Sequence, residues 1–324
     1  MKSTVVGPYP RVGSDYGDSL RRELNKKPVD SDLVEKLKRG LTVEVVREMV
    51  SAGISLPNTG LVDVHDEITW PLGYVNGVAL SSGMKKILHT NTHYKEPVVN
   101  GEVTRKAPIV NALYYIASQN SPQVKVELPG PYTMAQHSVL GEKSPYKNLA
   151  ELAIAYARVY REELQGLKYA PLVQFNEPSV IAFGRNKPDV AMLPEIYATM
   201  LDGLGVNAAV WTFYGKYSLE TLDLLFSLPV QVVGLDFVWD PDVDALLKRR
   251  AVDKGIGIGL IDSGDSGFIV PEDSDALLRR LKGLEDYLDL DKSLLSSNAT
   301  LEHLPREHAK RKLGLIGDIT KRMN

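Results

Sequence analysis

The sequence contains no cysteine, and this absence excludes several kinds of chemistry at once. Disulfide bonds, thiol nucleophiles, iron–sulfur clusters and every zinc site with a cysteine ligand are ruled out for this chain. Any catalytic or metal site that its own residues form must therefore use oxygen and nitrogen atoms.

A dominant charge and long apolar runs are also missing. The chain has 38 basic and 41 acidic residues and a net charge of −3, so no global field favours nucleic acid or an anionic membrane. No stretch approaches the roughly 18 apolar residues that span a bilayer, and residues 1–4 are not followed by the apolar segment of a secretion signal. We therefore expect a cytoplasmic protein that binds neither nucleic acid nor a membrane.

Short apolar runs rich in Val, Ile and Leu alternate with longer stretches of helical period along the chain. This alternation is typical of parallel strands joined by crossover helices. A length of 324 residues fits one (β/α)8 barrel of about 250 residues with insertions. We therefore predict an α/β fold, a single TIM-type barrel domain over residues 1–324. Its eight strands are expected at Thr4–Val6, Leu61–Val64, Val124–Leu128, Leu172–Phe175, Ala208–Thr212, Val232–Phe237, Gly257–Ile261 and Leu294–Ser297.

The sequence also predicts two helices and one irregular segment. Residues 31–52 and 147–167 have helical patterns, and Gly53 ends the first of them. In the second helix the apolar residues cluster on one face, so its tyrosines are expected to be packing residues. The segment Gly73–Pro108 interrupts the alternation of strands and helices. We expect it to form a long excursion between the second and third strands, on the catalytic rim.

Polar side chains follow several of the predicted strands. In a barrel of this kind the reacting groups lie at the carboxyl ends of the strands. Glu67 follows the second strand and Asn176 the fourth, while Asp236 ends the sixth and Asp262 follows the seventh. Glu67, Asp236 and Asp262 are therefore candidate catalytic residues. Because nearly every barrel carries such groups, they indicate a site without identifying a reaction.

A divalent cation site is the alternative interpretation of these strand ends. His65 and Glu67 lie two residues apart and could join Asp236 or Glu177 in a set of nitrogen and oxygen ligands. The more common outcome of such spacing is a hydrogen-bonded pair in which the histidine orients Glu67. We therefore expect no metal site here.

Two other candidate motifs carry little weight. His89 and His93 lie four apart, but the residues between them form a poor helix, and the catalytic glutamate of a zincin is absent. The alternating glycines of residues 255–259 match neither the dinucleotide fingerprint nor a phosphate-binding loop. No nucleotide site is indicated.

Two basic clusters are the strongest local feature. Arg21, Arg22, Lys26 and Lys27 lie within seven residues, and Lys85-Lys86 lie in the irregular segment. The two clusters could converge on a polyanionic ligand, each exposed contact contributing about 1 kcal/mol or less. A solvated helix face is the alternative that spacing alone leaves open.

At these residues the sequence resembles a known family, the cobalamin-independent methionine synthases. These are two-barrel zinc enzymes that transfer a methyl group from a methyltetrahydrofolate polyglutamate to homocysteine. The resemblance is to the amino-terminal barrel and covers nearly the whole chain. It is carried by GPYPRVG at 7–13, RELN at 22–25, MKKILHTNTHYKEP at 84–97, LPGPYT at 128–133 and QFNEP at 174–178.

The resemblance also shows what is missing. The catalytic barrel of this family holds zinc through a His-x-Cys pair, a glutamate and a second cysteine, and the corresponding positions here are Phe213 with Gly215, Asp236, and Ser297. Zinc activates the thiol of homocysteine, and a lone aspartate cannot hold the metal. The family's catalytic histidine is replaced near Asp262. Asn176 replaces an aspartate expected to hold the amino group of homocysteine.

The resemblance therefore implies an amino-terminal-type barrel that acts with a separate zinc-bearing methionine synthase core protein. Zinc is expected only in that partner, and this chain would help bind a polyglutamylated methyl-folate or a related pterin. By position, Arg22 and Lys86 match basic residues that hold the polyglutamate tail. Lys26 is a possible substitute for a third, and Glu67 is retained near the substrate. Two alternatives stay open: an independent methyltransferase or lyase without zinc, and a non-catalytic folate-binding or pterin-binding module.

Overall fold

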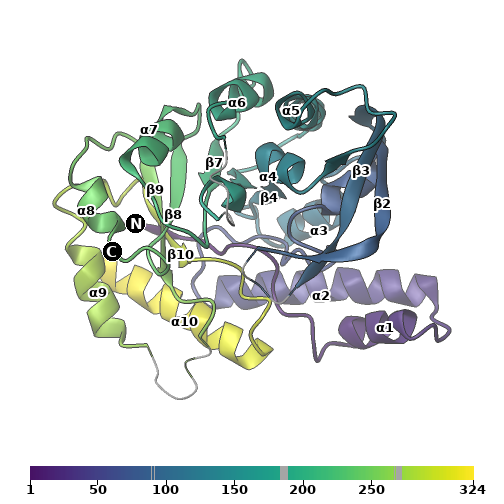
Figure 1. Ribbon diagram of the computed structural model, residues 1–324. Helices are drawn as coiled ribbons and strands as arrows, with labels where there is room; N and C mark the ends of the chain where they lie inside the picture. The colour runs from purple at the N-terminus through teal and green to yellow at the C-terminus, as the bar shows by residue number, and fades with distance from the viewer. Residues whose placement is uncertain (89, 91, 183–188, 266, 268–271) are drawn as a thin grey trace. The chain divides into compact units, whose positions relative to one another are not determined.

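The structure is a computed structural model of the chain. It describes residues 1–88, 90, 92–182, 189–265, 267 and 272–324. The chain divides into two compact units, and each is described by itself (Figure 1). Unit 1 comprises Met1–Val64, Asn111–Val126 and Gly255–Asn324, and unit 2 comprises His65–Val110 and Glu127–Lys254.

Among its described residues, unit 1 has three parallel strands and five helices. The strands lie in the order β1-β10-β9, with Lys2 opposite Leu294 and Leu294 opposite Gly257. Helix α1 contacts α2, and α2 in turn contacts α3, as Figure 1 shows for the first pair. The elements are β1 (Lys2–Ser3), α1 (Asp15–Leu24), α2 (Ser31–Ser51), α3 (Ala112–Asn120), β9 (Gly255–Ile261), α9 (Ser274–Lys282), β10 (Leu294–Ser297) and α10 (Arg306–Met323).

The second predicted strand, Leu61–Val64, is wrong, because these residues form a turn. The Asn58 side chain accepts a hydrogen bond from the Gly60 N–H, and Leu61 has a φ of +44°, which an extended strand does not allow. The extended segment lies earlier in the chain. Leu56 donates to the Ser3 carbonyl, and residue 57 accepts from the Lys125 N–H at 2.8 Å. A proline at residue 57 cannot donate to a strand ladder, so this segment stays too irregular to count as a strand.

In the part of unit 2 that the structure describes, four parallel strands lie in the order β8-β7-β6-β4. Val173 of β6 lies opposite Ala208 of β7, and Ala209 of β7 lies opposite Val232 of β8. The elements of this part are β4 (Val126–Pro129), α4 (Pro131–Gln136), α5 (Leu149–Gln165), β6 (Val173–Asn176), η2 (Pro178–Val180), α6 (Leu193–Leu201), β7 (Ala208–Trp211), α7 (Leu219–Ser227), β8 (Val232–Asp236) and α8 (Val243–Leu247).

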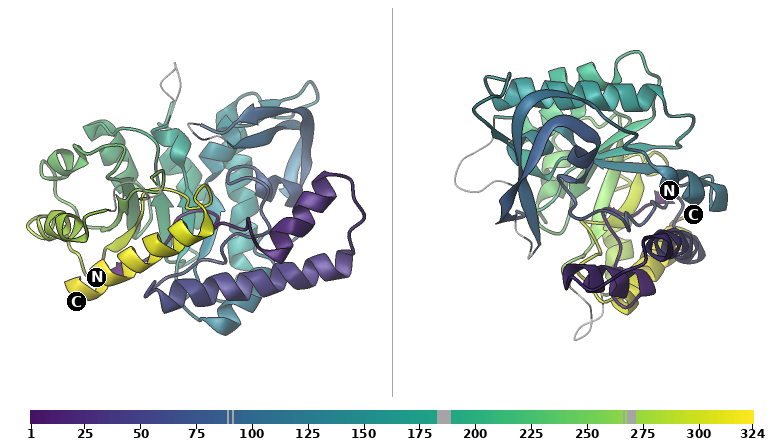
Figure 2. Two further views of the ribbon diagram at one scale, coloured as in Figure 1. Left: turned by 90° about the horizontal axis from the view of Figure 1, so that it is seen from below. Right: turned by 90° about the vertical axis from the view of Figure 1, so that its right-hand side faces the viewer.

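The irregular segment of the sequence is a regular sheet in the structure. After the short helix η1 (Trp70–Tyr74), β2 (Val75–Lys86) pairs antiparallel with β3 (His93–Arg105), and β5 (Val139–Leu140) joins the other side of β3. The pair is strongly curved (Figure 2). Register shifts at residues 76–78 and 80–84 accompany the curvature, since bulges increase twist and bend a strand.

The remaining expectations for the fold are largely confirmed. Six of the eight predicted strands match β4, β6, β7, β8, β9 and β10 within about two residues, while β1 ends at Ser3 and Thr4 forms only an isolated bridge. The two predicted helices correspond to α2 and α5. The fold is α/β with parallel strands, whereas the closed eight-stranded barrel, its excursion and the single domain stay predictions. No helix among the described residues is long and apolar enough to cross a membrane.

Helix α5 shows how the core of unit 2 is held. Asn148 caps its first turn through the Glu151 N–H, and Tyr156 and Tyr160 are fully buried, as predicted for packing residues. The Tyr160 ring lies 5.9 Å from the Phe175 ring of β6, and its hydroxyl donates to the Pro129 carbonyl at 2.8 Å. This hydrogen bond ties α5 to the carboxyl end of β4.

We predict that Tyr160→Phe lowers the free energy of unfolding by about 1 to 2 kcal/mol, because the buried carbonyl of residue 129 loses its donor. Urea unfolding measures the change. Tyr169→Phe is the matched control, since Tyr169 is 59% exposed, and should change the same free energy by less than about 0.5 kcal/mol. Equal effects of the two substitutions would contradict the role given to the Tyr160 hydroxyl.

Candidate functional site

A buried glutamate, Glu177, organises the carboxyl ends of β4 and β6 in unit 2. Its two oxygens accept the backbone N–H groups of Tyr132 at 3.1 Å and Thr133 at 2.7 Å, in the first turn of α4. A Cβ atom at Gly130 would lie 2.0 Å from the Glu177 carboxyl carbon. Glycine at this position is therefore what lets the carboxylate approach α4. The QFNEP and LPGPYT motifs meet here.

The protonation of Glu177 is unusual. Burial of the carboxylate raises its pKa to about 7, while the hydrogen bonds from Thr133 and Tyr132 oppose this rise. A carboxyl group with such a pKa exchanges a proton near neutral pH, which is a property of acid–base groups in active sites. It is also found in structural carboxylates, so the pKa alone assigns no reaction.

Asn176 lies beside Glu177 in a chain of buried side chains. The Asn176 carbonyl oxygen accepts from the Gln174 amide at 2.8 Å, and its amide donates to Glu127 at 2.7 Å. All three residues are buried within the neighbouring strands β4 and β6. The neutral amide at position 176 lets Glu127 receive a donor where an aspartate would place a second negative charge.

Asp236 ends β8 and is fully buried. One carboxylate oxygen accepts the N–H groups of Val238 at 3.0 Å and Trp239 at 2.9 Å, and the other accepts the Tyr214 N–H at 3.0 Å. Three backbone donors therefore surround this carboxylate. In this arrangement Asp236 fixes the loops that follow β7 and β8.

The residues that the sequence resemblance places at the zinc positions do not fit that metal. Phe213 is fully buried, and a Cβ atom at Gly215 would lie 2.3 Å from the Ile181 carbonyl oxygen, so no thiol could stand there without movement of the backbone. In unit 1, Ser297 offers only a hydroxyl. Among the residues that the structure describes, no three His, Asp or Glu side chains gather in a group that could hold a metal ion.

Asp262 lies at the carboxyl end of β9 in unit 1 and caps its own loop. One of its oxygens accepts the N–H groups of Gly264 at 2.7 Å and Asp265 at 3.3 Å. The Asp262 N–H donates to Glu272, which also accepts from Lys312 of α10. The sequence did not single out this buried lysine, because its partner lies 40 residues away.

Glu67 and its neighbours lie in unit 2 between a turn and η1. Both Glu67 carboxylate oxygens are buried, His65 is exposed, and Asp66 accepts three hydrogen bonds from Ile68 and Thr69. The structure shows no hydrogen bond between His65 and Glu67 among its described residues. His89 lies outside the described residues, and His93 is an exposed residue of β3.

The predicted basic residues are divided between the units. Arg22 and Lys26 are exposed in unit 1, at and just beyond the end of α1, whereas Lys86 belongs to unit 2. Lys86 lies opposite His93, and Met84 lies opposite Lys95. Opposed residues and alternate residues share one face of a strand pair, so these four exposed side chains form one face, which we call the hairpin basic face. Lys85 points to the other face and pairs with Glu96.

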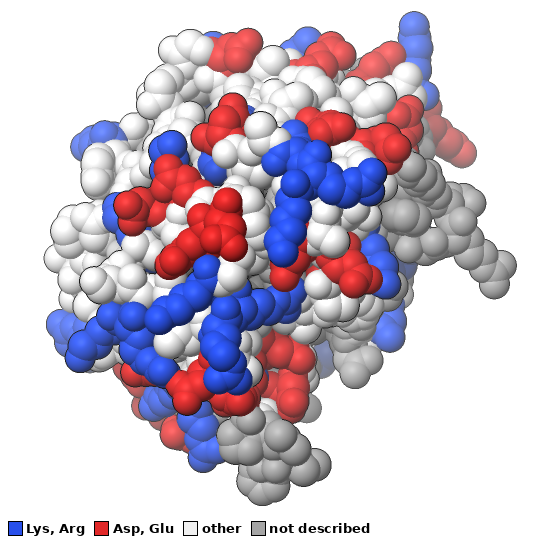
Figure 3. All heavy atoms as spheres, turned by 90° about the vertical axis from the view of Figure 1, so that its left-hand side faces the viewer, with Lys and Arg blue, Asp and Glu red and all other residues white. Residues whose placement is uncertain are grey.

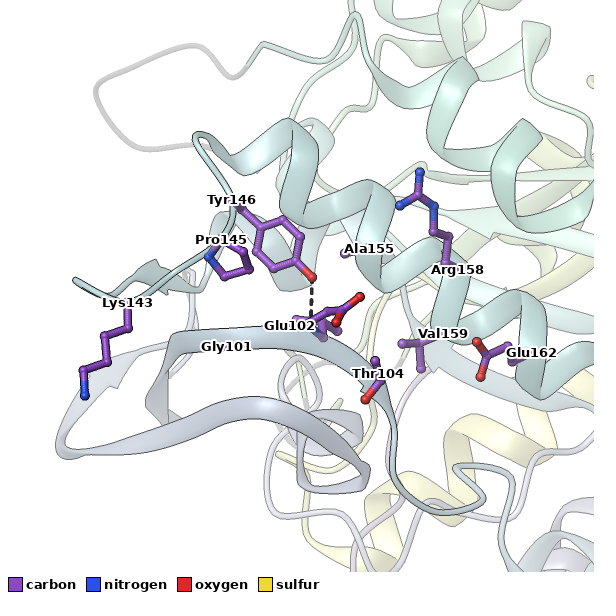
Figure 4. Close-up of a pocket in the computed structure, with 11 residues that line it drawn as sticks. Gly101, Glu102, Thr104, Lys143, Pro145, Tyr146, Ala155, Arg158, Val159 and Glu162 are labelled. Carbon is purple, nitrogen blue, oxygen red and sulfur yellow. Dashed lines mark hydrogen bonds between the residues drawn. The ribbon is translucent and has the colours of Figure 1, made fainter.

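A separate cavity of about 430 Å³ lies between β3 and α5 (Figure 4). The Tyr146 hydroxyl accepts the Val103 N–H at 2.8 Å along one wall, and Val159 lines the apolar part. Charged side chains of both signs surround it, and no predicted site residue lines it. Basic and acidic side chains are also interspersed on the face shown in Figure 3.

We predict that Glu177 makes stability depend on pH. Its raised pKa means that the folded chain binds a proton more tightly than the unfolded chain, so its contribution to stability falls as pH rises from about 4.5 to about 7. Urea unfolding of wild type and Glu177→Gln across this window should show their free-energy difference changing on the order of 3 kcal/mol.

Glu162→Gln removes one negative charge from an exposed position on α5 and is the control for net charge. Parallel pH profiles of wild type and Glu177→Gln would contradict the buried-carboxylate account of Glu177.

The comparisons with known proteins agree with the sequence motifs. Residues 73–288 match the family model described as cobalamin-independent synthase, N-terminal domain. The chain is 24% identical to a protein named methionine synthase from Saccharolobus islandicus, over 99% of this chain and 94% of that protein. It is 29% identical to a 5-methyltetrahydropteroyltriglutamate–homocysteine methyltransferase from Bacillus velezensis, over 70% of this chain but 30% of that protein.

A solved structure has a similar fold. A B12-independent methionine synthase from Shewanella sp. W3-18-1, in complex with selenomethionine, matches with a TM-score of 0.76 at 19% identity, over 99% of this chain and 98% of that chain. This likeness supports the α/β fold described above. Because the family model covers more than half of the chain, the chain belongs to the family of the N-terminal domain of cobalamin-independent synthases.

Proposed function

We propose that this chain serves methionine biosynthesis by helping to bind a methyltetrahydrofolate, or a related pterin donor, for methyl transfer to homocysteine on a separate zinc-bearing barrel. The observation that carries the proposal is the steric block at Gly215 in a chain of this family. No thiolate can stand at this position, and Asp236 is surrounded by backbone donors. The residues that the structure describes therefore offer no ligand set that could activate a thiol.

The hairpin basic face supports a role in binding the donor. Lys86 and Lys95 are exposed on it, and neither has a carboxylate partner among the described residues. A tail of several carboxylates would gain a charge-assisted contact with each lysine. Glu67 and Asn176, which also belong to unit 2, would line the substrate pocket. Arg22 and Lys26 are exposed cationic side chains of unit 1 that the sequence resemblance also assigns to the tail.

A second candidate function is an independent methyltransferase or lyase that uses Glu67, Asp236 and Asp262. One observation favours it: the Saccharolobus islandicus relative is matched over 94% of its length, so the name methionine synthase is carried by a chain of similar size. A folate-binding or pterin-binding module without a catalytic partner is the remaining alternative.

Mixing the purified chain with a zinc-bearing family member that has the cysteine ligands tests the proposal. We expect a complex by size-exclusion chromatography with light scattering, and more methionine from homocysteine and the methyl donor than the zinc protein forms alone. Absence of both effects would refute the proposal. Methionine formed by this chain alone would instead favour the second candidate.

Substitution of the basic residues tests the tail-binding role. We predict that Lys86→Ala and Arg22→Ala each weaken binding of a triglutamate donor by about 5-fold, and binding of the monoglutamate by much less, because each exposed contact contributes about 1 kcal/mol. Calorimetric titration at low salt measures both ligands. Lys282→Ala, which removes an exposed lysine of α9, is the control. Equal losses for the two ligands would count against the tail-binding role.

A further inference from the structure

Three aromatic side chains form a row on the loops that follow β7 and β8 in unit 2. The ring centroids of Phe213 and Tyr214 lie 4.9 Å apart, and those of Tyr214 and Trp239 lie 6.0 Å apart. Both contacts are edge-to-face, with interplanar angles of 86° and 73°. Such contacts are favourable beyond the burial of area alone, so the row is a defined structural feature.

The row runs from the core to the surface. Phe213 is 1% exposed, Tyr214 is 7% exposed, and Trp239 is 45% exposed. The row therefore ends in an indole ring that is accessible at the carboxyl ends of two parallel strands. In open α/β sheets and in barrels, ligands bind at this end of the strands.

The backbone at Tyr214 is strained, and hydrogen bonds to Asp236 hold it in place. Tyr214 has a φ of +70°, a conformation that is costly for a bulky side chain. The Tyr214 N–H and the Trp239 N–H both donate to the carboxylate of Asp236, at 3.0 Å and 2.9 Å. One buried carboxylate thus holds the backbone of Tyr214 and the backbone of Trp239 in place relative to each other. Strain that is maintained in this way is typical of ligand-binding sites.

We infer that the Trp239 indole is a stacking platform for a planar heteroaromatic ring. A flat ring with a π-face gains contact with an accessible indole that packs edge-to-face against Tyr214 and whose backbone N–H is held by Asp236. The inference deepens the proposed function, because the pterin of the proposed donor is such a ring. Trp239 would contact the pterin ring of the donor, whereas the basic residues would contact only its polyglutamate tail.

Calorimetric titration with pterin itself, which has no glutamate tail, tests the inference on the full chain. We expect wild type to bind pterin, Trp239→Leu to bind it about 10-fold more weakly, and Trp239→Phe to lose about 3-fold. Leucine keeps an apolar side chain but removes the π-face, while phenylalanine keeps a smaller π-face. Trp70→Phe, at a half-buried tryptophan of η1, should bind pterin as wild type does.

Several outcomes would overturn the inference. They are no binding of pterin by wild type, unchanged binding by Trp239→Leu, and equal losses in Trp239→Leu and Trp239→Phe. Near-ultraviolet circular dichroism establishes that each variant keeps its fold. The result is separable from the proposed function. Pterin binding that depends on Trp239 can hold without any effect of tail length, and an effect of tail length at Lys86 can hold without Trp239.

Discussion

Buried carboxylates that bind backbone N–H groups are the constraint on which this candidate site depends. Glu177 holds the first turn of α4 to the end of β6, and Asp236 holds the loops that follow β7 and β8. Each carboxylate is fully buried, so the hydrogen bonds must offset a large loss of hydration. The carboxyl groups at these strand ends therefore position the chain, and a metal ion would have to displace these backbone donors.

In a member of the family of the N-terminal domain of cobalamin-independent synthases, this use of carboxylates supports the proposal that thiol activation takes place on another protein. At Gly215 the Ile181 carbonyl occupies the space that a side chain would need. Phe213, two residues earlier, begins an aromatic row instead of offering a nitrogen ligand. The backbone path of this loop therefore leaves no room for a side chain at Gly215, and it carries two of the three rings of the aromatic row.

Much of the fold could be predicted from the sequence because six strands are short, fully buried segments whose residues are mostly apolar. The strand expected at Leu61–Val64 failed because side-chain bonds from Asn58 and Thr59 turn the chain, and local hydrogen bonds of this kind compete with extended structure. The strands β2 and β3 were missed since their exposed, glycine-containing sequence lacks a clean alternation.

The sequence predicted where the polar residues of the candidate site lie better than it predicted what each of them does. Asn176 and Asp236 lie at strand ends as expected, yet the partners that define them come from distant segments: Glu127 is 49 residues from Asn176, and Tyr214 is 22 residues from Asp236. Trp239 was missed for the same reason. A tryptophan three residues after a strand-ending aspartate was the available signal, but its aromatic neighbours become visible only when β7 and β8 are placed side by side.

The central claim is that this chain positions a methyl donor and leaves thiol activation to another protein. The most direct measurement is the zinc content of the purified chain, by elemental mass spectrometry after gel filtration in buffer that contains micromolar zinc. The account predicts far less than one zinc per chain, in wild type and in Asp236→Ala alike. Stoichiometric zinc in wild type that is lost in Asp236→Ala would contradict it.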